Sequence, residues 1–148
     1  MKIVVRVDYA SRRPAPARAA IARWVEDAVR GLTRSSVAVG VRIVNETESA
    51  ALNERYRGRP YATNVLAFPF AAPPGARSDT LGDLVICAPV VNREAVAQGK
   101  PAAAHWAHMV VHGIMHLRGY DHKNRRDAAV MERKEAAVLR RLGYANPY

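Results

Sequence analysis

Hydrophobic and polar positions alternate along two segments in the first third of the chain. Ile3, Val5 and Val7 alternate with more varied neighbours, and the alternation is regular in SVAVGVRIV, residues 36–44. A period of two is typical of β-strands that bury one face. Between the two segments, apolar residues recur every three or four positions over residues 21–32, which predicts an amphipathic helix.

The rest of the chain predicts two further strands among helices. Asn45 and Glu48 predict the N-cap and third-position acid of a second helix. The segments NVLAFPF and LGDLVICAP are rich in β-forming residues, and the polar AAPPGARSDT separates them. A short helix is expected over residues 92–98, a longer one between Pro101 and Gly119, and a last one over residues 130–142. Early strands and late helices predict one α+β domain over residues 1–148, with about four strands in a small sheet covered by helices.

Composition limits the class of protein. Hydrophobic residues make up 49% of the 148 residues and charged residues 24%, as in globular proteins. No apolar run approaches the ~20 residues of a membrane helix, and the N-terminus lacks the unbroken apolar core of a signal peptide. The only cysteine, Cys87, excludes an intramolecular disulfide and a multi-cysteine metal site. We therefore expect a soluble cytoplasmic protein without a membrane partner.

The charge balance favours a polyanionic partner. Lys and Arg total 23 against 13 acids, a net charge of +10, and 19 of the 23 cations are arginine. The planar guanidinium suits phosphate, so nucleic acid is a natural candidate. The alternative is a compositional bias that places solvated arginines on helix faces.

All five histidines lie within HWAHMVVHGIMHLRGYDH, residues 105–122. His112 and His116 are one helical turn apart, so their imidazoles can bind the same ion. Gly119 breaks the helix, and His122 follows it by three residues and can return to the same point. Three imidazoles with an open fourth position describe a catalytic zinc site, although nickel, cobalt and iron accept the same ligands.

This spacing equals that of the metzincin proteases, HExxHxxGxxH, with one difference. Gly113 stands where those proteases carry the glutamate that serves as general base, which disfavours peptide hydrolysis by that mechanism. His105 and His108 lie one to two turns before the site and are not predicted as ligands. Asp121 is expected either to accept a hydrogen bond from a ligand imidazole or to form an Asx turn after the glycine.

The order of several segments resembles the bacterial YbeY family of endoribonucleases and ribosomal RNA maturation factors. These segments are HGIMHLRGYDH, LNERYRG, TNVLAFPF, LGDLVIC and the closing M-x-x-x-E and LGY. The resemblance implies a zincin-like α+β domain with a mixed sheet and one Zn2+ held by His112, His116 and His122. It also implies single-strand-specific RNA cleavage, a role in maturing the 3′ end of the small-subunit 16S ribosomal RNA, and ribosome quality control.

The resemblance further suggests residues and partners. Arg57 matches an arginine linked to function in the family, and Arg57 and the metal ligand His112 are the candidate catalytic residues. The small ribosomal subunit is the implied partner, with a ribosomal protein or a ribosome-assembly GTPase as a further candidate. Two positions depart from the family pattern: Ala67 replaces a common serine, and Asn64 stands at a position that is Asn or Asp. The loop GRPYATN also replaces a lysine-rich form.

These residues suggest a mechanism in which RNA lies across a basic cleft and Arg57 stabilises charge on the phosphoryl oxygens. The attacking group stays open between a metal-activated water and the 2′-hydroxyl of the substrate. Arginines near the site in sequence are expected to contact phosphates without reading sequence; they are Arg55, Arg59, Arg118, Arg125 and Arg126. Two rival hypotheses are a non-catalytic ribosome-assembly factor with a structural zinc and a metal-dependent hydrolase of a peptide or small ester.

Overall fold

A computed structural model describes all residues, 1–148. Four strands form one sheet in the order β1-β2-β4-β3. The strands β1 (Lys2–Tyr9), β2 (Ser36–Val44) and β4 (Thr80–Cys87) run parallel, and β3 (Val65–Pro69) pairs antiparallel with β4. The α+β class and the small mixed sheet that the sequence predicts are confirmed.

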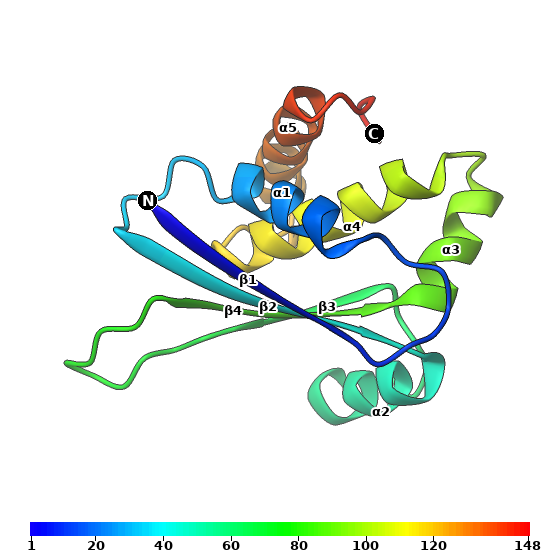
Figure 1. Cartoon of the computed structure of the whole chain (residues 1–148), viewed down its shortest axis with the longest axis horizontal. Helices are drawn as coiled ribbons and strands as arrows, with labels where there is room; N and C mark the ends of the chain where they lie inside the picture. The colour runs from blue at the N-terminus through cyan, green and yellow to red at the C-terminus, as the bar shows by residue number, and fades with distance from the viewer.

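The helices cover the two faces of this sheet unequally (Figure 1). On one side lie α1 (Arg18–Ala28), α4 (Ala102–Leu117) and α5 (Arg125–Arg141), whereas α2 (Glu46–Arg57) lies on the other. The helix α3 (Ala88–Ala97) packs on α4 at one end of the sheet. The connection between β3 and β4 extends beyond the sheet as a long hairpin. One face of the sheet is therefore fully covered and the other only in part.

The helix α4 lies at the centre of the hydrophobic core. It contacts β3 and β4 on one side and α1, α3 and α5 on the others. Its apolar side chains are therefore distributed around the helix and are not confined to one face. Trp106, Val110 and Ile114 are almost fully buried, and the alternating valines of β2 face the same core. The histidines of α4 therefore project from the helix that has the most buried residues. No helix in the structure combines the length and apolar character that crossing a membrane requires.

Two local predictions are wrong. LVICAP does not continue as a strand: β4 ends at Cys87 and α3 begins at Ala88, four residues before the predicted start. Pro89 lies in the first turn of α3, where its fixed φ favours a helix and its missing N–H costs nothing. Asn45 does precede α2, but Glu48 pairs with Arg42 at 2.6 Å instead of completing a capping box.

Candidate metal centre

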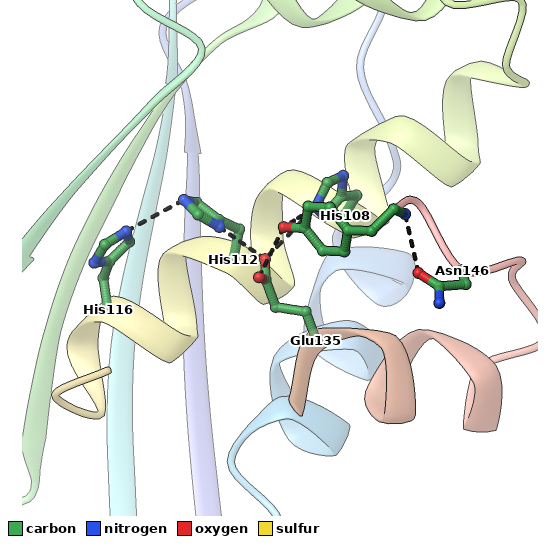
Figure 2. A network of polar contacts seen from close by, with 6 residues as sticks. His108, His112, His116, Glu135 and Asn146 are labelled. Carbon is green, nitrogen blue, oxygen red and sulfur yellow. Dashed lines mark hydrogen bonds and ion pairs between the residues drawn. The ribbon is translucent and has the colours of Figure 1, made fainter. Parts of the chain in front are cut away.

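Two of the predicted ligands are fixed by consecutive turns of α4. The rings of His112 and His116 project from the helix toward the same point, and their Nε2 atoms lie 3.2 Å apart (Figure 2). Both rings are partly buried. Burial and, after it, the neighbouring rings of His112 and His122 lower the pKa of His116, so its imidazole is neutral near pH 7. The neutral imidazole is the form that binds a metal ion.

The third histidine reaches this point through a chain reversal. Gly119 has φ +96°, a left-handed conformation that side chains rarely adopt, and it ends the helix as a C-cap glycine. The chain then returns, and the ring of His122 lies 5.1 Å from that of His116, centroid to centroid. One nitrogen from each of His112, His116 and His122 lies within 4.8 Å of the others. The structure thus brings together the three histidines that the sequence predicts as ligands.

The donor atoms fit a divalent metal. Two nitrogens bound to one tetrahedral zinc at ~2.0–2.1 Å lie about 3.3 Å apart, close to the 3.2 Å between His112 and His116. The Nδ1 atom of His112 lies 2.7 Å from a carboxylate oxygen of Glu135 and therefore carries the proton. The unprotonated Nε2 of His112 consequently points toward the Nε2 of His116, and the two nitrogens can bind one cation. Because His122 is solvent-exposed, a further ligand position stays accessible.

A buried carboxylate holds His112 from the side opposite the metal position. Glu135 projects from α5, is fully buried, and also accepts a hydrogen bond from the hydroxyl of Tyr148 at 2.8 Å. His108 completes the network, because its Nε2 lies 3.1 Å from that hydroxyl. Burial raises the pKa of Glu135, but the hydrogen bonds to His108 and His112 outweigh burial and lower the pKa to about 2. The carboxylate is therefore charged and fixes the tautomer of His112.

Glu135, and not Asp121, is the carboxylate that contacts a ligand imidazole. The side chain of Asp121 is 43% exposed, and its Oδ1 accepts a hydrogen bond from the backbone N–H of His122 at 2.7 Å. This bond is local, to the next residue, so Asp121 lines the hollow without contacting a ligand imidazole. Glu135 could have been found from the sequence as a charged residue within the apolar stripe of the last helix.

Gly113 reflects the close approach of α4 to the sheet. A Cβ atom at this position would lie 2.7 Å from Cδ2 of Leu84 and 3.3 Å from Cγ2 of Val65. The position that carries glutamate in metzincins is thus closed by β4 and β3. The site has no carboxylate in the place from which those proteases take a proton.

A second buried pair lies beside the site. The Nε2 atom of His105 lies 2.9 Å from Glu94, and Glu94 accepts a hydrogen bond from the side-chain amide of Asn64 at 3.2 Å. Burial raises the pKa of Glu94, but the hydrogen bonds from His105 and Asn64 lower it below its usual range. His105 therefore connects to the wall of the site through Glu94 and Asn64, and its ring also packs edge to face against that of His108. Asn64 and Ala67 both line the cavity beside the histidines. Asn64 presents a side-chain amide there, whereas Ala67 has no hydroxyl group to offer.

The histidines open into a hollow of about 830 Å³ between the end of α2, β3 and the end of α4. Arg57 lines this hollow, is exposed, and has no hydrogen-bond or ion-pair partner within the protein. Arg55 and Arg59 lie beside it on the surface but do not line it. Arg118 differs, because its guanidinium donates to the carbonyl oxygen of Ala28 at 2.8 Å. The structure gives Arg118 a role in joining α4 to α1 and does not place it in the hollow.

Comparisons with known proteins agree with this arrangement. The family model described as "Endoribonuclease YbeY" matches residues 8–143. An endoribonuclease YbeY of Methylococcus capsulatus is 56% identical over 146 residues, which are 99% of this chain and 95% of that protein. One of Alkalilimnicola ehrlichii is 51% identical over 151 aligned residues, covering 100% of this chain and 91% of the relative.

A solved structure has a similar fold. The solution structure of a Thermotoga maritima protein matches with a TM-score of 0.65 and 26% identity, covering 92% of this chain and 87% of that one. The family match includes β2, β3, β4, the hollow and the histidine segment, and both sequence relatives align over 99–100% of the chain. The chain therefore belongs to the YbeY family of endoribonucleases.

Proposed function

We propose that this chain is a zinc-dependent endoribonuclease that cuts single-stranded RNA and matures the 3′ end of the 16S ribosomal RNA. The observation that carries the proposal is the open three-histidine site with an unpaired arginine in the same hollow. The relatives named endoribonuclease YbeY support RNA as the substrate. Ribosome quality control, contact with the small ribosomal subunit, and work in the cytoplasm follow from this role.

Each residue at the hollow has a distinct role in the proposed reaction. His112, His116 and His122 would hold the ion, which when bound supplies a Lewis acid at the open side of the site. Glu135 keeps the Nε2 atom of His112 directed toward it. The guanidinium of Arg57 can donate two hydrogen bonds to one phosphate group and so stabilise the charge that develops on the phosphoryl oxygens. Gly113 provides no general base at the position that carries one in the metzincins.

The rival hypotheses have less support. A structural zinc needs a fourth protein ligand, and the Asp121 carboxylate is bonded to the backbone of His122 rather than joined to the histidine group. A peptidase of the metzincin type needs a base that Gly113 excludes. The positive net charge of +10 favours a polyanionic substrate over an ordinary peptide.

The proposal is tested by comparing the wild type with His116→Ala and Arg57→Ala in ribonuclease-free preparations. Metal content is measured by mass spectrometry, and cleavage is followed on a single-stranded RNA copied from the 3′ end of 16S ribosomal RNA. We expect His116→Ala to lose metal and cleavage, and Arg57→Ala to keep metal and lose about 100-fold or more in rate, as removal of a preorganised donor does. Equal cleavage by all three proteins would identify a contaminant and favour the assembly-factor hypothesis.

A further inference from the structure

Seven large hydrophobic side chains are exposed on this protein, and only one of them lines the histidine hollow. That residue is Tyr56, at the end of α2 and immediately before Arg57, and it is 57% exposed. Its ring packs edge to face against Phe68 of β3, with centroids 5.1 Å apart and an interplanar angle of 70°. Phe68 lines the hollow as well. Two aromatic rings from different elements thus meet at the rim of the site.

The protein itself makes little use of the Tyr56 ring. Its hydroxyl takes part in no hydrogen bond within the chain, unlike the hydroxyl of Tyr148, which donates to Glu135. The guanidinium carbon of Arg55, an exposed residue, lies 5.4 Å from the Tyr56 ring centroid. An exposed aromatic ring with a free hydroxyl and a cation nearby can stack against a flat ligand.

We propose that Tyr56 and Phe68 form a stacking platform that binds one unpaired nucleobase of the substrate beside the cleavage site. The inference rests on the proposed function and names the feature of the RNA that this site recognises. A base can stack on a tyrosine ring only when it has left its own stack, which a duplex resists. Since Arg57 follows Tyr56 directly, one turn of helix offers a contact for the base and another for a phosphate. This arrangement selects single-stranded RNA by shape, with little preference for base identity.

The experiment compares binding of an eight-nucleotide single-stranded RNA with binding of copies that each carry one abasic position. Fluorescence anisotropy gives the Kd for the zinc-loaded wild type, Tyr56→Ala and Tyr56→Phe, and a gel confirms that the RNA is intact afterwards. We expect Tyr56→Ala to weaken binding about 5- to 100-fold and Tyr56→Phe to bind like the wild type. The matched control is Phe70→Ala, because Phe70 is 49% exposed but does not line the hollow.

The abasic copies identify the stacked position. At one position, removing the base should weaken RNA binding by the wild type by the same factor as the Tyr56→Ala substitution does. Removing that base should not weaken binding by Tyr56→Ala any further. Equal losses by both proteins at every position would overturn the platform. In the wild type, 2-aminopurine at the stacked position should be quenched on binding, which tests the proposal even if Tyr56→Ala fails to fold. Absence of a protein-dependent quench at every position would also overturn it.

The outcomes separate this inference from the proposed function. Position-specific stacking without any cleavage would contradict the endoribonuclease and leave the platform standing. Cleavage that depends on Arg57, together with Kd values that are unchanged in Tyr56→Ala, would contradict the platform and leave the endoribonuclease standing.

Discussion

At the scale of single residues, the buried carboxylate of Glu135 determines how the histidine site is presented. A charged group with a fully buried side chain is tolerated here because His112 and Tyr148 both donate hydrogen bonds to it. The same hydrogen bonds give His112 a fixed orientation and a free Nε2 atom. The carboxylate therefore contributes to the site by orienting His112 and does not belong to the group of three histidines that would hold the ion.

Replacing Glu135 by glutamine tests this role. The variant Glu135→Gln keeps the size of the side chain but loses the charge that favours a proton on Nδ1 of His112. We expect zinc affinity to fall about 10- to 100-fold, as measured by competition with a chromophoric chelator, because partners of ligand histidines have effects of this size. The control Glu132→Gln makes the same change on the same helix. Unchanged affinity in Glu135→Gln would show that the histidines are oriented by packing alone.

At the scale of elements, the sequence predicts most of what is local and misses what depends on tertiary contacts. The spacing of His112, His116 and Gly119 falls within α4 and its C-terminal turn, so helical geometry alone suffices to predict it. Glu135 and Tyr148 come from α5 and the tail, and no local pattern connects them to His112.

The incorrect element boundaries have a similar origin. The segment around Val90 and Val91 is rich in β-branched residues, so its composition suits a strand, but packing on α4 makes it part of α3. The predicted capping box does not form because both carboxylate oxygens of Glu48 accept hydrogen bonds from Arg42 of β2. Tertiary contacts outweighed local propensity in both cases.

The contact between α4 and β4 is tested by filling the space that Gly113 leaves. In Gly113→Val the new side chain would overlap Leu84, which is fully buried, and we expect a loss of about 1–3 kcal/mol in the free energy of unfolding. Urea denaturation measures this loss, and Ala103→Val at the exposed start of α4 is the control. Adding Leu84→Ala should cost less than the two single changes together, because each relieves the other. Strict additivity would argue against direct contact.

At the scale of the whole molecule, the arginines differ in whether an acidic side chain neutralises them. Several arginines are neutralised by acids away from the hollow: Arg42 pairs with Asp8 and Glu48, Arg93 with Glu46, and Arg141 with Asp27. The arginines at the end of α2 and in the loop after it have no acidic partner; they are Arg55, Arg57 and Arg59. Three cations without an acidic partner therefore lie together beside the histidine site, where an RNA backbone would pass.

This distribution predicts how RNA binding responds to salt. If three arginines contact phosphates, the logarithm of the association constant should fall with the logarithm of the salt concentration with a slope of about −2. Arg57→Ala should make the slope shallower by about 0.7, since one phosphate contact is lost. Arg23→Ala should leave it unchanged, because Arg23 lines a separate hollow with Glu26 and Asp27. Anisotropy titrations at several salt concentrations measure each slope. A flat response in the wild type, or equal changes in both variants, would mean that the arginines beside the hollow do not hold the RNA.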